Sequence, residues 1–343
     1  MKYFSKIFFV ASLIFTLSGQ SVASEVNVYT SRHYDSDEKI YTDFKNLTGI
    51  KVNIISGKGK ALMERLRLEG KNSPADLFIT SDAGNLWKIQ KDGMFKEILS
   101  EKVKKTVPKN FRGPNNEWVG IAKRSRVIFY NSERVTDLEI KNITYEDLAD
   151  PRWKGRLVVR SSGNIYNQSL VASLISNIGI ERTEKWAKGI VKNFARKPQG
   201  NDRSQILAVA NGEADIAIAN TYYIGLMLSG EKGVEQKNAA EKVSMIFPGQ
   251  ADTGTHINIS GVGILKNAPN TSNAEKLIEY LLTDKVQKHI VDNTYEYSIK
   301  SNIMPNKIIA EFGLNFKTDE TYASEFGKFN AEAVRLMDRA GWR

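Results

Sequence analysis

The chain has 343 residues, of which 41% are hydrophobic and 26% are charged, so it is long enough for two domains with their own cores. It has no cysteine and only three histidines (His33, His256 and His289), which excludes disulfides, thiol catalysis, iron–sulfur clusters and the paired histidines of zinc hydrolases. The formal net charge is +10, but the lysines are scattered and no nucleic-acid-binding motif is found, so we expect no nucleic-acid partner.

The first 23 residues are typical of a secretory signal peptide. Two lysines precede an apolar run from Ile7 to Leu17, and the small residues Ser21 and Ala23 frame a cleavage site. A membrane anchor is the alternative, but the apolar run is shorter than the about 20 residues that span a bilayer. We therefore expect cleavage after Ala23 and export to the periplasm. The mature chain would have 47 basic and 39 acidic residues, and a charge of +8.

Short strands alternate with helices after residue 23. Hydrophobic periods of two residues predict strands, and periods of about 3.6 residues predict helices. The predicted order is a strand at 25–31, a helix at 34–49, a strand at 50–57, a helix at 60–70, a strand at 75–82 and a helix at 83–93. This alternation predicts a largely parallel, doubly wound sheet.

The segment 118–135 is extended and no helix follows it, which predicts either a strand pair or one strand that passes between two lobes. A second series follows, with strands at 155–162 and 214–220 and helices at about 166–177, 181–197 and 203–212. The segments 242–249 and 256–267 predict another extended crossing. Helices are expected over about 272–293 and about 322–338.

Two α/β series joined by extended crossings predict two lobes, each a mostly parallel sheet flanked by helices, with a cleft between them. We assign residues 24–123 and about 252–300 to an N-lobe, and about 124–251 and 301–343 to a C-lobe. Ligands of such sheets bind beyond the carboxyl ends of the strands, so the loops that follow strands should carry the site.

Tyrosines and arginines gather in these loops. Tyr34 follows the first strand, Tyr166 follows a strand of the second series, and Tyr222 and Tyr223 follow the strand that ends at Asn220. A single tyrosine at a loop edge more often packs its ring and turns its hydroxyl to water. Four phenols after three different strands, all expected at one face, indicate a common site. The same loops and the crossing segment carry Arg32, Arg124, Arg126 and Arg203, although Arg124 or Arg126 could also form an ordinary surface ion pair.

Converging phenols have a chemical use as metal ligands. A tyrosine hydroxyl is neutral at pH 7, but a strongly acidic cation can displace its proton and bind the hard, anionic phenolate oxygen. Fe(III) is such a cation, and with four phenolates the charges sum to −1, which a guanidinium could neutralise. Adjacent residues of a regular helix do not face each other. We therefore expect Tyr222 and Tyr223 to lie at an irregular strand-to-helix turn, where both can point at one ion.

Several motifs resemble the periplasmic ferric-iron-binding proteins of ABC transporters, which have the type II periplasmic-binding-protein fold. The resemblance covers nearly all of the chain after residue 23. It is carried by "VNVYTSRHY", "PADLFITSDAGNLW", "RSRVIFYNSERV", "LADPRWKGRLVVRSS", "QGNDRSQILAVANGEADIAIANTYYIG" and "FPGQADTGTHINISGVGILKNAPN". The family carries a pair of tyrosine ligands in the "NTYYIG" segment, so Tyr222 and Tyr223 inherit that role.

The resemblance implies the rest of the site. One branch of the family binds iron through a histidine, a glutamate, the tyrosine pair and a bound anion. This chain has no clear counterpart of the glutamate, since Glu64 falls inside a predicted helix, and it resembles the tyrosine-rich, Fut-type branch. The implied metal ligands are Tyr34, Tyr166, Tyr222 and Tyr223, and the implied outer residues are His33, Arg126 and Arg203. We expect Tyr34, rather than His33, to bind the metal, because a phenolate brings negative charge.

The resemblance also implies the function. A monomeric periplasmic carrier would bind Fe(III) as cargo, without catalysis, and deliver it to an inner-membrane ABC permease driven by its ATPase. Two alternatives stay open: a carrier of a small organic anion or polyamine, and an exported hydrolase. The hydrolase is disfavoured, because the chain has no G-x-S-x-G motif, no cysteine nucleophile and no histidine pair of a metal hydrolase.

Overall fold

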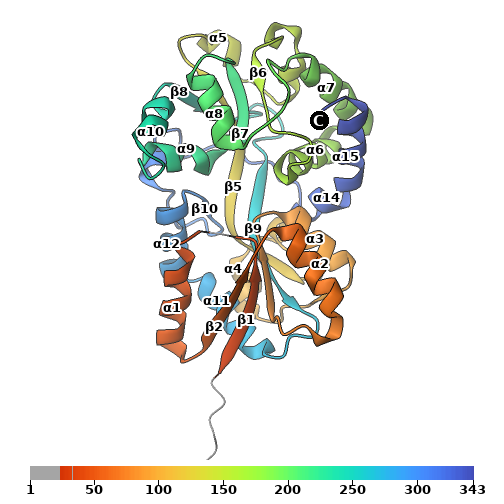
Figure 1. Cartoon of the computed structure of the whole chain (residues 1–343), viewed down its shortest axis with the longest axis vertical. Coiled ribbons are helices and arrows are strands. Elements are labelled where there is room, and N and C mark those ends of the chain that lie inside the picture. Colours follow the sequence, from red (N-terminus) through yellow and green to blue (C-terminus); the bar gives the residue numbers. More distant parts are fainter. Residues whose placement is uncertain (1–23, 33) are drawn as a thin grey trace, which may run out of the picture.

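The computed structural model describes residues 24–32 and 34–343, so the predicted signal peptide and His33 lie outside the described residues. The described chain forms two lobes, and the C-terminus lies in the upper one (Figure 1). Two long strands, β5 (Trp118–Asn131) and β9 (Ile257–Leu265), run from one lobe to the other. The predicted two-lobe α/β architecture is confirmed, and the segment 118–135 is one crossing strand rather than a strand pair.

The strands of both lobes form one continuous network. Its main order is β2-β1-β3-β9-β5-β7-β6, and β10 and β8 pair with β5 while β4 pairs with β9. The remaining strands are β1 (Glu25–Thr30), β2 (Lys51–Ser56), β3 (Leu77–Thr80), β4 (Phe95–Lys96), β6 (Leu157–Val158), β7 (Ile216–Asn220), β8 (Val243–Ile246) and β10 (Tyr297–Ser298).

The pairing is mixed, and the expectation of mostly parallel sheets is wrong. Of the nine strand pairs among the described residues, only β1–β2, β1–β3 and β6–β7 are parallel. The crossing strands cause the difference, because β9 runs antiparallel to β3 and β5 runs antiparallel to β7 and β9. Hydrophobic periodicity predicts a strand but not the direction of its neighbour.

The pairing partners of β5 change along its length. Residues up to Ser125 pair with β9 and β10, and residues from Arg126 onward pair with β7 and β8. This change lies within two residues of the boundary expected at 123/124. The assignment of 24–123 with about 252–300 and of about 124–251 with 301–343 to separate lobes stays a prediction.

Helices cover the sheets in both lobes (Figure 1). None of those among the described residues is both long enough and apolar enough to cross a membrane. They are α1 (Asp37–Thr48), α2 (Gly59–Glu69), α3 (Ala83–Lys91), α4 (Glu101–Thr106), α5 (Asp137–Ile140), α6 (Ile165–Ile178), α7 (Ile180–Lys192), α8 (Asp202–Ala210), α9 (Thr221–Leu228), α10 (Val234–Ala240), α11 (Thr271–Leu281), α12 (Asp284–Thr294), α13 (Lys307–Ala310), α14 (Ala323–Lys328) and α15 (Asn330–Arg339), with short 3-10 turns at Gly70–Asn72, Lys109–Phe111, Glu146–Ala149 and Pro151–Trp153.

Capping residues explain where the site-bearing helices begin. The side-chain oxygen of Asn164 accepts a hydrogen bond from the backbone N–H of Tyr166 at 3.1 Å, which starts α6. Helix α12 begins in the same way, because Thr283 accepts a bond from the N–H of Val286. This cap divides the predicted range 272–293 into α11 and α12, and α14 and α15 divide 322–338 in a similar way.

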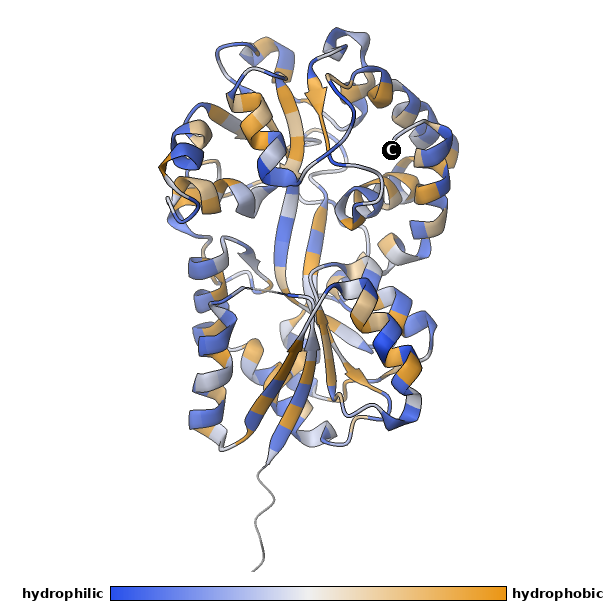
Figure 2. Cartoon of the chain, in the orientation of Figure 1, coloured by the Kyte–Doolittle hydropathy of each residue, from blue (hydrophilic) through white to orange (hydrophobic). Residues whose placement is uncertain are grey.

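Hydrophobic residues follow the strands and the inner faces of the helices, whereas the section of β5 between the lobes is hydrophilic (Figure 2). Trp118, Trp153 and Trp342 are among the largest fully buried side chains. The indole N–H of Trp342 donates to the backbone oxygen of Arg160 at 2.9 Å, which fastens the C-terminus to the upper lobe. The polar crossing section of β5 is therefore where function, rather than core packing, should be sought.

His256 lies buried just before β9, where the chain crosses between the lobes. Its ring is 2% exposed and packs against Phe326 with a centroid distance of 4.8 Å. Burial lowers the pKa of the imidazole well below its usual range, because the charged form would lose its hydration. Asp319 opposes this shift, and Arg126 and Arg124 add to it. The folded protein therefore holds His256 neutral.

We expect the free energy of unfolding to fall as the pH drops below about 6.5, the usual imidazole pKa. Below that pH the unfolded chain binds a proton at His256 and the folded chain does not, which contributes up to about 1.4 kcal/mol per pH unit. Urea unfolding of the parent and of His256→Gln, between about pH 7.5 and pH 5, measures this contribution. The variant should show the shallower pH dependence, and equal slopes would contradict the assignment.

Candidate metal site

The four predicted tyrosines lie around one cavity of about 470 Å³ between the lobes. Arg203 lines the same cavity, as predicted for a residue near the site. The loop of Tyr34 belongs to the lower lobe, whereas α6 and α9, which carry the other three tyrosines, belong to the upper lobe (Figure 1). The structure thus brings together side chains from three separate segments.

Tyr222 and Tyr223 lie in the first turn of helix α9. Strand β7 ends at Asn220 and the helix begins at Thr221, so the irregular turn expected between strand and pair is absent, and that expectation is wrong. Both rings nevertheless reach the cavity, with their centroids 4.2 Å apart and their planes inclined by 31°. The first turn of a helix has free N–H groups and the positive end of the helix dipole, which favours anionic side chains there.

Tyr34 meets this pair from the other lobe. It lies in the loop between β1 and α1, and its ring centroid is 6.5 Å from that of Tyr222, in an edge-to-face arrangement of 81°. The guanidinium of Arg32 lies over the ring of Tyr34, with its central carbon 4.4 Å from the ring centroid. The contact between Tyr34 and Tyr222 joins the two lobes directly at the cavity.

Tyr166 is the second residue of α6 and faces two guanidinium groups. The central carbon of Arg124 is 5.1 Å from its ring centroid, and that of Arg160 is 5.6 Å away. Positive charge over a phenol ring is attracted by the π-system, and it would also stabilise a phenolate. These two arginines therefore hold Tyr166 in an electropositive position.

The phenols of Tyr34, Tyr222 and Tyr223 each have a pKa above the usual range. Burial is the largest cause for all three, because a phenolate that leaves water loses its hydration. Neighbouring phenols and carboxylates raise the pKa further, and nearby guanidinium groups such as Arg124 oppose the shift. The three phenols are therefore protonated at neutral pH, and a cation that binds to them must displace their protons.

A buried ionic cluster lies behind the tyrosines. Glu296 accepts hydrogen bonds from Arg32, from Arg124 at 3.4 Å and from the hydroxyl of Ser260 at 3.0 Å. Arg32 also pairs with Asp37 at 2.8 Å. The four charged residues are at most 6% exposed. Sequence reasoning missed this cluster, because Glu296 is 264 positions from Arg32.

Of the two arginines predicted near the metal, Arg203 lines the tyrosine cavity and Arg126 does not. Arg126 is buried and bonds to Asp202 at 3.2 Å and to the side chains of Asn220 and Asn167 at 3.0 and 2.6 Å, so it supports the start of α9 from below and does not line the cavity. Arg203 does line the cavity and is half-buried. Arg32 lines the cavity and Arg124 lies over Tyr166, but neither was among the implied outer residues, and Arg160, which also lies over Tyr166, was missed.

Other donor sets are less suited to a metal. Among residues 24–32 and 34–343, no three His, Cys, Asp or Glu side chains gather closely enough to hold an ion. Glu64 is half-exposed on α2 and pairs with Arg67, as expected for a surface residue. The predicted outer residue His33 lies outside the described residues. Asp35 and Glu231 also line the tyrosine cavity, but the four phenols are the largest set of like oxygen donors that converge on it.

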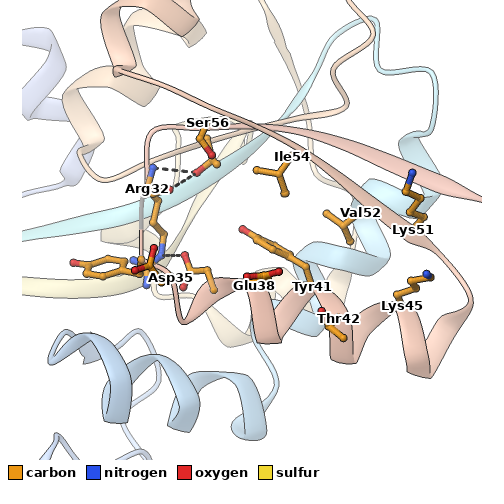
Figure 3. A pocket seen from close by; sticks show the side chains of 13 residues that line it. Arg32, Asp35, Glu38, Tyr41, Thr42, Lys45, Lys51, Val52, Ile54 and Ser56 are labelled. Atoms are coloured by element: carbon orange, nitrogen blue, oxygen red, sulfur yellow. Dashed lines mark hydrogen bonds and ion pairs between the residues drawn. The ribbon is translucent and has the colours of Figure 1, made fainter. Parts of the chain in front are cut away.

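A larger cavity of about 560 Å³ lies beside the tyrosine cavity, between α1 and β2 (Figure 3). It shares Arg32 and Tyr34 with the tyrosine cavity, but Tyr166, Tyr222 and Tyr223 do not line it. Its wall carries Tyr41 and Lys45 from α1 and apolar residues from β2. The smaller cavity is the better metal site, because several like donors converge only there.

Known proteins share both the sequence and the fold. The chain matches the model of the bacterial extracellular solute-binding protein family over residues 72–316. Iron uptake protein A1 of Synechocystis is 49% identical over 319 residues, which is 93% of this chain and 88% of that protein. The structure of Trichodesmium IdiA (FutA) in complex with iron and citrate ligands is 48% identical, covers 93% of this chain and 100% of that one, and has a TM-score of 0.90. The ferric iron-binding protein A of Mannheimia haemolytica in an open conformation is 40% identical, covers 93% and 99% of the two chains, and has a TM-score of 0.86. The chain therefore belongs to the bacterial extracellular solute-binding protein family.

Proposed function

We propose that this protein is a periplasmic carrier that binds Fe(III) in the cavity between its lobes, through the phenolates of Tyr34, Tyr166, Tyr222 and Tyr223. The observation that carries the proposal is the convergence of these four rings, from both lobes, on one cavity. The iron named for the Synechocystis and Trichodesmium relatives supports the same cargo. Phenolates are hard, anionic ligands, and Fe(III) is a hard cation of high charge.

Binding proceeds by exchange of protons for the metal. Tyr34, Tyr222 and Tyr223 are protonated in the empty site, so each of them that ligates Fe(III) as a phenolate releases a proton, and affinity falls as the pH falls. Burial strengthens each metal–oxygen interaction, because little water screens it. A trivalent cation offsets the cost of deprotonation through strong interaction with the phenolate oxygens, whereas a weaker Lewis acid offsets much less of it.

Closure of the cleft completes the coordination. Tyr34 approaches from one lobe and the other three tyrosines from the opposite lobe, so an open cleft would separate Tyr34 from its partners. Fe(III) shifts the equilibrium toward the closed form only to the extent that it binds that form more tightly. Binding of Fe(III) should therefore increase the closed fraction of the carrier.

Delivery requires a membrane partner. Members of this family work with an ABC permease, and we propose an inner-membrane permease, its ATPase, a monomeric carrier and a signal peptide that is removed on export. We propose no catalytic activity, since the relatives are binding proteins. The buried Arg32 and Arg124 are already paired with Glu296, so an organic anion would be met by Arg203, whereas the four phenols around the cavity favour a metal ion.

The test of the proposed function is the colour of the loaded protein. Fe(III) bound to phenolates should give a visible charge-transfer band, and Tyr222→Phe or Tyr223→Phe should weaken or shift that band while retaining the packing of the ring. Tyr41→Phe is the matched control, because Tyr41 lines only the neighbouring cavity. Tight Fe(III) binding by a colourless parent protein would remove the phenolate ligands from the proposal.

Tyr34 and His33 compete for the role of ligand from the lower lobe. We expect Tyr34→Phe to weaken Fe(III) binding and alter the visible band, because a phenolate oxygen is lost. His33→Ala should leave the band nearly in place. Titration of both variants with Fe(III) in the presence of a competing chelator measures the affinities. Loss of iron by the histidine variant, with colour and affinity kept by Tyr34→Phe, would reverse the assignment.

Arg203 should balance the charge of the loaded site. Four phenolates and Fe(III) sum to −1, and Arg203 lines the cavity without forming an ion pair with any described residue. One charge roughly 10 Å away in a medium of dielectric constant about 20 contributes about 1.7 kcal/mol, which solvent reduces to about 1 kcal/mol at a half-exposed position. We therefore expect Arg203→Gln to lower Fe(III) affinity by roughly fivefold.

The same substitution should make the Fe(III)/Fe(II) reduction potential more negative, because a lost positive charge disfavours the extra electron. Arg203→Lys should restore most of both properties. Arg182→Gln is the matched control, since Arg182 pairs with Glu146 on the surface. An unchanged reduction potential in Arg203→Gln would show that the charge of Arg203 does not interact with the bound metal.

A further inference from the structure

Asp82 lies at a second contact between the lobes, beside the crossing strands. It follows β3 in the lower lobe and caps α3, with one oxygen accepting the backbone N–H of Gly84 at 2.7 Å. Its other oxygen accepts from the side chain of Asn258, on crossing strand β9, at 2.9 Å. The carboxylate is fully buried. A helix cap alone would not require burial, since most caps lie at the surface.

The remaining partner of Asp82 comes from the upper lobe. The hydroxyl of Ser169, on α6, lies 3.0 and 3.2 Å from the two carboxylate oxygens and is itself fully buried. Ser169 is three residues after Tyr166, so both lie on the same face of α6, one turn apart. Asp82 therefore contacts the helix that presents a metal ligand from the opposite lobe.

The helices pack closely around this bond. A side chain at Gly84 would lie 3.5 Å from Ile165 and 3.6 Å from Ser169, so the start of α3 lies directly against the first turns of α6. On the outer side, α14 packs against α3 so tightly that a β-carbon at Gly327 would lie 2.2 Å from the side chain of Trp87. The lobes thus meet here through a dry, close-fitting surface.

We propose that Asp82 is a positioning residue of the metal site: through Ser169 it holds α6, and with it Tyr166, in the closed arrangement of the lobes. This inference rests on the proposed function, because it concerns a ligand of the proposed metal. The bond is suited to be a reversible latch. When the cleft opens, Asp82 keeps Gly84 and Asn258 as partners and water replaces Ser169, so only one protein contact of the carboxylate is broken.

The absence of cysteine allows a direct test. Leu47 on α1 and Leu138 on α5 are 73% and 85% exposed, at positions in the lower and upper lobes, and their replacement by cysteine provides two specific sites for a fluorescent dye pair. Single-molecule energy transfer then gives the ratio of closed to open molecules, with and without Fe(III). The measurement is made on the parent, on Ser169→Ala and on Ser173→Ala.

Ser173→Ala is the matched control. Ser173 lies one turn after Ser169 on α6 and also donates to a buried carboxylate, that of Asp319, which the C-terminal segment supplies. We expect Ser169→Ala to lower the closed-to-open ratio roughly tenfold in whichever sample shows both states, as for the loss of a hydrogen bond to a charged group. The control should keep the ratio of the parent.

Two outcomes would overturn the proposal. Equal ratios in Ser169→Ala, Ser173→Ala and the parent would show that the bond does not hold the lobes. A single distance in every sample would also contradict it, because a latch requires two states. The energy-transfer result does not depend on colour, so a protein that latches but binds no Fe(III) would refute the proposed function and leave the latch supported. A faster transfer of Fe(III) to a chelator by Ser169→Ala alone would link the latch to the metal.

Discussion

The structure depends on a balance of buried charge where the chain crosses between its lobes. Four arginines form ion pairs there with three carboxylates, those of Asp37, Asp202 and Glu296, and a buried charge without a partner would cost several kcal/mol. The ion pairs join distant segments, as in the bonds of Glu296 with Arg32 and Arg124 and in those of Asp202 with Arg126 and Arg160. Because these groups pair with one another, Arg203 is left as the arginine of the cavity lining that can respond to the charge of a bound ion. The phenols and the metal therefore determine the charge of the site.

This balance separates two kinds of arginine that look alike in the sequence. Arg126 was expected near the metal, but its guanidinium forms hydrogen bonds with Asp202 and Asn220 at the start of α9. Arg203, from the same prediction, lines the cavity and is available to the loaded site. The difference arises from the partner of each guanidinium, and partners from remote segments cannot be read from local sequence.

Sequence periodicity predicted most strands and helices near their observed positions, and the rule that ligands bind after strands placed all four tyrosines at one cavity. Strand direction was predicted poorly, because the crossing strands add in the antiparallel sense to the edge of each parallel set, β9 next to β3 and β5 next to β7. The tyrosine pair was placed correctly for an incorrect reason. Its residues need no irregular turn, since the first turn of α9 already directs both rings to the cavity.

The raised pKa values of the phenols carry the selectivity of the proposed site. A cation can bind a phenolate here only after a buried hydroxyl has lost its proton, and the free energy of that deprotonation is the same for every cation. A trivalent ion recovers it through strong interaction with several anionic oxygens in a poorly screened cavity, whereas a singly or doubly charged ion recovers much less. Burial thus serves two purposes in the proposed site: it keeps Tyr34, Tyr222 and Tyr223 neutral when the site is empty, so that they can lie together without repulsion, and it favours the ion with the highest charge.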